Sequence, residues 1–276
     1  MKILITGHKG FIGKNLFKFL KAKKVKVKGY DYKTNKKFPK IKGFDWVIHL
    51  GAISSTTETN IKKVMRQNFY FSKKLLLECI YHNVNFQYAS SASVYDKKFG
   101  FNENSKCLPK SPYSLSKLMF DEYVGETKNN SIVVQGFRYF NVFGPNENDK
   151  KNQASPVYKF IKQAKLKKKI SIFYNSKNYK RDFVYIGDVC EVHKKMLNKK
   201  ISGLYNVGRG KAISFEIIAK EISKKFKCKL NYIKMPNIIK KHYQKYTKAN
   251  NTKLSKIIKV NWTDPIKYIK EVRKIY

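Results

Sequence analysis

The sequence predicts an α/β fold in which a parallel β-sheet is covered by helices on both faces. Short apolar runs alternate with segments of helical periodicity over roughly the first half of the chain. This alternation is typical of a parallel sheet whose crossover connections are helices. After Pro145 the alternation becomes irregular, and short strands mixed with helices predict a smaller α+β lobe.

Each expected element follows from its residue pattern. Residues 2–6 are an apolar run that ends at a glycine, which predicts a buried strand, and Leu16, Phe17 and Leu20 give the next segment the spacing of a helix. The further strands expected are residues 25–30, 45–50, 86–90, 132–137, 170–173, 183–185 and 204–207. The further helices expected are residues 61–82, 113–127, 156–165, 188–197, 215–226 and 266–274.

The composition limits the class of protein. A chain of 276 residues with 42% hydrophobic residues can bury a large core, which excludes a largely disordered chain. No apolar run approaches the ~18 residues of a membrane-spanning helix, and no segment reads as a signal peptide. The four cysteines lie far apart without a CxxC pair, so we expect neither a metal site nor a disulfide framework. We therefore expect a cytoplasmic protein that does not bind membranes.

The net charge of +42 is the unusual feature of the chain. Taken alone, it would suggest nucleic acid or another anionic partner. Nearly all of the basic residues are lysines, however, and they are spread through every segment instead of along one stripe. We interpret the charge as a consequence of A/T-rich codons and do not expect a nucleic-acid partner. A milder role, in which the field of the protein draws an anionic substrate to the site, is the remaining alternative.

A glycine-rich turn lies between the first strand and the first helix. Gly7, Gly10 and Gly13 have the spacing that allows a tight turn, a close approach of the backbone to a pyrophosphate, and close packing of helix on strand. Asp31, at the end of the second expected strand, is placed to meet the adenosine ribose. The fold expected is therefore a Rossmann-type doubly wound parallel sheet with a smaller C-terminal α+β substrate lobe.

The expected domains follow from this division. Residues 1–145, with about 183–207 returning to them, form the NAD(P)-binding Rossmann domain, and residues 146–182 and 208–276 form the substrate-binding lobe. The cofactor itself is expected to be NADP, with NAD as the alternative. Asp31 would bind a free 2′-hydroxyl and repel a 2′-phosphate, whereas Lys33, Lys36 and Lys37 could neutralise that phosphate.

A Tyr-x-x-x-Lys pair supplies candidate catalytic residues. Tyr113 and Lys117 share one face of the expected helix, and an ammonium beside a phenol favours the phenolate that accepts a proton. Upstream, the strand that ends in Ala89-Ser90-Ser91 places a hydroxyl, that of Ser91, beside the tyrosine. The glycine turn, the serine-rich strand end and the Tyr-x-x-x-Lys pair together predict a dehydrogenase-type site.

With these motifs the chain resembles the extended short-chain dehydrogenases/reductases that modify nucleotide sugars. Among them it is most similar to the ADP-L-glycero-D-manno-heptose 6-epimerases. The glycine turn and the Tyr-x-x-x-Lys pair are shared by the whole superfamily, whereas residues 54–58, residues 120–124 and Tyr243-Gln244 are typical of the heptose epimerases. The matching segments are residues 7–13, 51–58, 88–95, 113–124, 136–145, 180–189, 203–215 and 243–249.

The resemblance implies an isomerase that inverts C6″ of ADP-D-glycero-D-manno-heptose for lipopolysaccharide inner-core synthesis. Such a protein would oxidise and then reduce its substrate with a tightly bound cofactor, and we expect it to be a homo-oligomer. Tyr113 would be one acid/base and Lys150, which follows the Gly-Pro pair at 144–145, would be the second. By composition alone Lys150 would be a solvated loop lysine, and Lys151 is the alternative register.

The resemblance also implies the binding residues. The catalytic set is Ser91, Tyr113, Lys117 and Lys150. The cofactor-binding set is Gly7, Gly10, Phe11, Ile12, Gly13, Asp31, Tyr32, Lys37, Leu50, Gly51, Ala52, Ser54, Asn68, Lys117, Val142 and Lys150. The substrate-binding set is Ser55, Asn141, Asn152, Lys159, Phe173, Tyr174, Asn175, Ser176, Arg181 and Tyr243.

The chain departs from the family after Asp31. Only thirteen residues separate Asp31 from Asp45, where the family usually has another strand and helix. We therefore expect one sheet strand and some adenine contacts to be missing. Two alternatives stay open: another sugar-nucleotide enzyme such as a UDP-hexose 4-epimerase, and a non-catalytic dinucleotide-binding protein.

Overall fold

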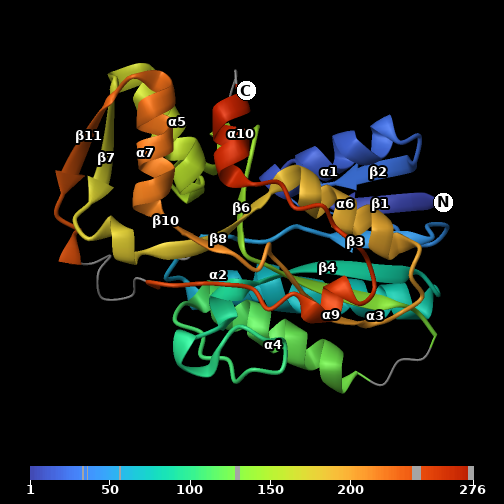
Figure 1. Ribbon diagram of the computed structural model, residues 1–276. Coiled ribbons are helices and arrows are strands. Elements are labelled where there is room, and N and C mark those ends of the chain that lie inside the picture. Colours follow the sequence, from blue (N-terminus) through green and yellow to red (C-terminus); the bar gives the residue numbers. More distant parts are fainter. Residues whose placement is uncertain (33, 36, 56, 128–130, 238–243, 273–276) are drawn as a thin grey trace.

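Six parallel strands form the central sheet of the computed structural model (Figure 1). The structure describes residues 1–276 apart from 33, 36, 56, 128–130, 238–243 and 273–276, and apart from the side chains of 149, 151 and 152. The strand order is β2-β1-β3-β4-β5-β9, and every neighbouring pair is parallel. The bounds are β1 Lys2–Thr6, β2 Lys26–Tyr30, β3 Trp46–His49, β4 Asn85–Ser91, β5 Val134–Tyr139 and β9 Gly203–Val207. The expected doubly wound sheet is confirmed.

Helices cover both faces of this sheet (Figure 1). On one face α1 (Phe11–Ala22) and α6 (Ile186–Leu197) pack over Ile3 and Ile5. On the other face α3 (Phe71–Tyr81) and α4 (Pro112–Glu126) pack over Leu4. Because successive strand residues point to opposite faces, the apolar run of β1 feeds both cores, as the sequence predicts for a strand buried on both sides.

The helix expected over residues 61–82 is not continuous. It consists of α2 (Ile61–Val64), a π-helical turn (Met65–Tyr70) and α3. Within that turn Asn68 is buried, and its side chain accepts from the N–H of Ile53 at 2.8 Å and donates to the carbonyl of Ile53 at 3.0 Å. A π-helical turn often marks a functional site, and here it anchors the loop after β3.

The segment between β2 and β3 is short, as expected. Among its described residues there is neither a strand nor a helix, so β2 is the end strand of the sheet. The hydroxyl of Tyr30, at the end of β2, holds this segment against the strand by donating to the carbonyls of Asn35 and Lys37, both at 3.0 Å.

The C-terminal lobe has its own core and two small sheets. Helices α5 (Pro156–Lys167), α7 (Phe215–Phe226) and α10 (Pro265–Glu271) pack with the parallel pair β7 and β11 around a separate apolar cluster (Figure 1). The remaining bounds are β6 Asn141–Phe143, β7 Lys169–Phe173, β8 Lys180–Tyr185, β10 Ala212–Ser214, β11 Lys229–Ile233 and α9 Thr252–Ser255. The strand expected at 183–185 is part of β8, which pairs with β6 and β10 and not with the central sheet. Conversely, Leu254 of α9, which the sequence division assigns to the lobe, packs against the core of the central sheet.

Three helices begin in the same way. Ser111, Ser155 and Asp264 are the N-cap residues of α4, α5 and α10, and each is followed directly by a proline. Each cap accepts a hydrogen bond from a backbone N–H two or three residues later, which satisfies a donor that the helix leaves unpaired. Proline at the next position costs nothing because its missing N–H would have no helical partner. These caps fix the first residues of α4 and α5, two helices that carry or border candidate site residues.

No helix in the described part of the chain has the length and apolar character to cross a membrane.

A buried polar cluster connects β4, β5 and α6. His193 contacts the side-chain oxygen of Gln87 at 2.7 Å through Nδ1 and the hydroxyl of Tyr139 at 2.5 Å through Nε2. Gln87 also donates to Gln135 at 2.8 Å. Burial lowers the pKa of His193 to about 3, and burial followed by the charge of Lys117 lowers the pKa of His49 to about 3. Both rings are therefore neutral in the folded protein.

We expect the free energy of unfolding to fall as the pH drops below about 6.5. The unfolded chain then binds protons at His49 and His193 that the folded protein does not bind, because both pKa values are lowered from 6.5 to about 3 on folding. This stability is complete above pH 6.5 and is lost progressively towards pH 3, by about 1.4 kcal/mol per pH unit for each histidine. Urea titrations between pH 7.5 and pH 4.5 measure the slope. In His193→Gln the slope should be roughly halved, and an unchanged slope would contradict the assignment.

Candidate active site

The glycine turn between β1 and α1 is packed against backbone. Gly7 has φ = +72°, and a Cβ there would lie 2.5 Å from the Cα of Gly51, which lies just after β3. A Cβ on Gly13 would lie 2.2 Å from the carbonyl oxygen of Gly7. Both positions therefore require glycine: neither has room for a Cβ, and Gly7 also has a backbone conformation that other residues rarely adopt.

The first turn of α1 is suited to an anion. Its N-cap residue, Gly10, has no side chain that could cap the helix, and the first turn holds no acidic residue. The N–H groups of a first turn lack helical partners and carry the positive end of the helix dipole. Gly7, Gly10 and Gly13 line a cavity there. The residues present thus fit the pyrophosphate of the dinucleotide that the sequence predicts.

That cavity has a volume of about 950 Å³ and follows the carboxyl ends of the parallel strands. Residues at or just after the ends of β1, β2, β3, β4 and β5 contribute to its wall. Ligands of open α/β sheets bind at this edge. The predicted site residues in the wall are Gly7, Gly10, Phe11, Ile12, Gly13, Asp31, Tyr32, Leu50, Gly51, Ala52, Ser54, Ser91, Tyr113, Lys117, Asn141, Val142 and Lys150.

Tyr113 and Ser91 meet at this wall. Tyr113 lies in the first turn of α4, Ser91 ends β4, and a side-chain hydrogen bond joins the two. The Ser91 hydroxyl oxygen also accepts from the hydroxyl of Ser93 at 2.9 Å. The sequence predicted this pairing of strand end and helix.

Lys117, one turn further along α4, holds the same strand end. Its Nζ donates to the carbonyl oxygen of Ala89 at 2.8 Å, and the residue is only 4% exposed. Burial lowers the pKa of Lys117 to about 8, and the charge of Asp121 acts in the opposite direction. Lys117 therefore positions the segment that carries Ser91.

The electrostatics of Tyr113 differ from the expectation. Burial raises the pKa of Tyr113, its hydrogen bond with Ser91 lowers it, and the charge of Asp121 raises it. The groups that shift the pKa of Tyr113 do not include Lys117. The phenol is thus the favoured form of Tyr113 near neutral pH, and Ser91 is the contact that promotes proton loss.

Lys150 enters the cavity from the loop between β6 and α5. Its Nζ donates to the carboxylate of Glu147 at 3.1 Å and lies 4.5 Å from the centre of the Phe11 ring, in the first turn of α1. The side chain is 23% exposed. The structure therefore brings the second predicted acid/base into the cavity that Tyr113 lines.

Other predicted residues do not line this cavity. Asn68 lies behind its wall, where it binds Ile53 and Ser116. The others outside the wall are Lys37, Ser55, Lys159, Phe173, Tyr174, Asn175, Ser176 and Arg181. Tyr243, Lys33, Lys36 and the side chain of Asn152 lie outside the described residues.

Arg181, one of the predicted substrate-binding residues, is buried in β8. It donates to the carbonyls of Lys180 and Gln244, and its guanidinium lies over the ring of Phe215 at 5.4 Å. Tyr174, another predicted substrate-binding residue, is 55% exposed and stacks on Tyr232. In this structure these lobe residues are separate from the cofactor wall.

Sequence reasoning missed two groups of residues. Glu147 is fully buried beside Lys150. The sequence signal that could have revealed it is an acid three residues before the predicted catalytic lysine. The π-helical turn and the start of α3 also contribute to the cavity wall through Arg66, Gln67, Tyr70, Phe71 and Lys74. Their orientation depends on the π-helical turn, which a uniform helix pattern does not reveal.

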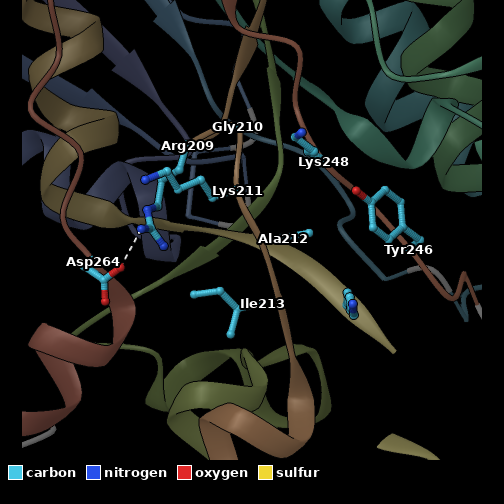
Figure 2. Close-up of a pocket in the computed structure, with 9 residues that line it drawn as sticks. Arg209, Gly210, Lys211, Ala212, Ile213, Tyr246, Lys248 and Asp264 are labelled. Atoms are coloured by element: carbon cyan, nitrogen blue, oxygen red, sulfur yellow. Dashed lines mark hydrogen bonds and ion pairs between the residues drawn. The ribbon is translucent and has the colours of Figure 1, made fainter. Parts of the chain in front are cut away.

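A second cavity, of about 440 Å³, lies beside β10 (Figure 2). Lys180, Arg209, Lys211 and Lys248 line it, and Arg209 pairs with Asp264 at 2.7 Å across one side. None of the predicted site residues lines this cavity. Within the described residues, no three His, Cys, Asp or Glu side chains gather as metal ligands.

Comparisons with known proteins agree with this geometry. Residues 3–208 match the family described as "NAD dependent epimerase/dehydratase family". The chain is 36% identical to the ADP-L-glycero-D-manno-heptose-6-epimerase of Brachyspira hyodysenteriae over 289 residues, covering 91% of this chain and 90% of the relative.

Solved structures give the same result. The crystal structure of the Helicobacter pylori ADP-L-glycero-D-manno-heptose-6-epimerase matches with a TM-score of 0.86 and 31% identity, over 98% of this chain and 94% of that one. The UDP-N-acetylglucosamine 4-epimerase of Methanobrevibacter ruminantium also has a TM-score of 0.86, over 98% and 96% of the two chains, but at 22% identity that likeness shows the fold alone. The chain thus belongs to the NAD-dependent epimerase/dehydratase family, within the extended short-chain dehydrogenases/reductases.

Proposed function

We propose that this protein inverts C6″ of ADP-D-glycero-D-manno-heptose by transient oxidation and reduction with a tightly bound nicotinamide cofactor. The observation that carries the proposal is that Tyr113 and Lys150, the two predicted acid/base residues, line one cavity together with the glycine turn. Inversion at a carbon without an acidic C–H requires oxidation first, and a group for each orientation of the sugar. The identity to heptose epimerases supports this substrate.

Tyr113, Ser91 and Lys150 have different roles in the proposed reaction. Bound NAD(P) would supply the hydride acceptor and then the hydride donor. Tyr113 takes the proton of the C6″ hydroxyl as the secondary alcohol becomes a ketone, and Ser91 hydrogen-bonds the reacting oxygen. After the sugar has turned, Lys150 returns a proton to the oxygen while the opposite face is reduced. The two side chains exchange their protons with solvent before the next turnover.

The finer assignments belong to the same proposal. NADP is the proposed cofactor, because Lys74 lines the cavity together with Asp31 and supplies a cation at that end. The identity to heptose epimerases supports assigning the sugar nucleotide to the predicted substrate residues of the lobe. We place the protein in the cytoplasm as a homo-oligomer, in the supply of heptose for the lipopolysaccharide inner core.

Purified protein incubated with ADP-D-glycero-D-manno-heptose and a catalytic amount of NADP or NAD tests the proposal. We expect conversion to the L-glycero epimer, resolved by chromatography, with NADP more effective than NAD. UDP-glucose is the matched control and should not be converted. If UDP-glucose alone were epimerised, the protein would be a UDP-hexose epimerase instead. Cofactor binding without turnover of either substrate would indicate a non-catalytic binding protein.

A further inference from the structure

Glu147 is a fully buried carboxylate in the loop that carries Lys150. Its Oε1 accepts from the N–H of Gly144 at 3.1 Å and from the hydroxyl of Ser155 at 2.7 Å. Its Oε2 accepts from the N–H of Ser155 at 2.6 Å and from Nζ of Lys150 at 3.1 Å. Both carboxylate oxygens are thus fixed by two donors each.

The protein donors around Glu147 are themselves rigidly held. A Cβ on Gly144 would lie 2.4 Å from Cγ2 of Ile186, so β6 packs closely on α6 at this point. Ser155 is the N-cap residue of α5. A buried carboxylate is costly unless it is both hydrogen-bonded and paired with a charge, and the ammonium of Lys150 forms that ion pair at 3.1 Å. The fixed member of this pair is therefore the acid, and the lysine is placed by it.

Lys150 needs such a partner because its side chain is long and flexible. Its other close contact is the face of the Phe11 ring, at 4.5 Å. Glu147 on one side and Phe11 on the other hold the ammonium next to the turn that binds the cofactor.

The carboxylate of Glu147 also acts electrostatically on a second lysine, Lys159. Burial lowers the pKa of Lys159, the charge of Lys150 lowers it further, and the charge of Glu147 raises it. Two cations thus share the field of one buried acid. Without the carboxylate, Lys150 would face the like charge of Lys159 and move away from it.

We propose that Glu147 is a positioning residue that holds the amine of Lys150 in the cavity for proton transfer to the sugar. This inference rests on the proposed function, in which Lys150 is the second acid/base. It adds a residue that does not touch the reacting atoms and acts through Lys150.

A double-mutant cycle tests it. Lys150→Met should lower kcat by about 10² to 10⁴, and Glu147→Gln by about 10- to 100-fold, as for residues that orient a catalytic ligand. In the double variant kcat should be no lower than in Lys150→Met, because Glu147 then has no amine to place. The Kd for the cofactor should be the same in Lys150→Met and in the double variant. Losses that multiply in the double variant would overturn the proposal, because a merely structural carboxylate acts independently of Lys150.

Glu216→Gln is the matched control variant. It breaks a Glu–Lys pair of 2.7 Å, with Lys220, on α7 outside the cavity, so kcat should not change. If Glu147→Gln fails to fold, Glu147→Asp, which keeps the charge but withdraws it by one methylene, takes its place in the cycle.

A second measurement does not depend on turnover. Reductive methylation followed by mass spectrometry should modify Lys150 faster in Glu147→Gln than in the wild type, while Lys220 reacts equally in both. If the wild type converts no ADP-heptose, the proposed function fails, and this labelling alone decides whether Glu147 holds Lys150. Equal labelling of Lys150 in the two proteins would overturn the inference.

Discussion

Replacing Tyr113 by phenylalanine should lower kcat by a factor of about 10² to 10⁴, the usual contribution of a positioned acid/base. The change removes only the hydroxyl that meets Ser91 and leaves the ring in the first turn of α4. Cofactor affinity should therefore stay close to that of the wild type. Turnover of ADP-heptose, with cofactor binding measured by titration, separates the two effects.

The pH dependence gives a further readout for Tyr113. Burial raises the pKa of this phenol, so the proton-accepting form becomes more abundant as the pH rises above neutrality. The wild-type rate should increase in that direction, and the residual rate of Tyr113→Phe should not. Tyr123→Phe, which removes a phenol from the same helix outside the cavity, is the matched control. A Tyr113→Phe enzyme with full activity would remove this residue from the mechanism.

Gly7→Ala should abolish measurable cofactor binding and destabilise the fold. The added Cβ would lie 2.5 Å from backbone atoms of Gly51, and the residue would have to keep φ = +72°. The conformation alone costs about 1–2 kcal/mol, and relief of the overlap must displace the turn that faces the pyrophosphate. We expect the Kd for the cofactor to rise at least about 100-fold, equivalent to ~2.7 kcal/mol.

Gly43→Ala separates conformation from space. Gly43 has a similar φ of +86°, but a Cβ there would meet nothing within 4 Å. This variant should lose only the conformational cost of about 1–2 kcal/mol of unfolding free energy and bind the cofactor normally. Urea unfolding and cofactor titration of both variants make the comparison. If Gly7→Ala behaved like Gly43→Ala, close approach would not explain the glycine.

The local parts of the fold could be predicted because their causes are local. The apolar runs of β1 and β3 and the glycine turn identify a buried parallel sheet and its ligand edge from adjacent residues alone. The pairing of Ser91 with Tyr113 follows from the end of a strand and the start of a helix, which the motif order places together.

The parts that could not be predicted depend on distant contacts. The π-helical turn at Met65–Tyr70 accompanies the pairing of Asn68 with Ile53, fifteen residues away. The strand at 183–185 looked suitable for the central sheet, yet β8 pairs with β6 and β10 instead. The guanidinium of Arg181 is bound to a carbonyl 63 residues further along the chain. Composition and periodicity contain no information on such partners.

The short connection after Asp31 has a consequence for how separate molecules meet. Because no described strand lies beyond β2, the outer backbone of that strand is an open edge, which another chain could extend by hydrogen bonding. Lys26 and Lys28 alternate along β2 and are exposed, and charged side chains on an edge strand oppose such pairing. Lys26 and Lys28 thus disfavour the growth of one sheet into the next, and with it aggregation through this edge.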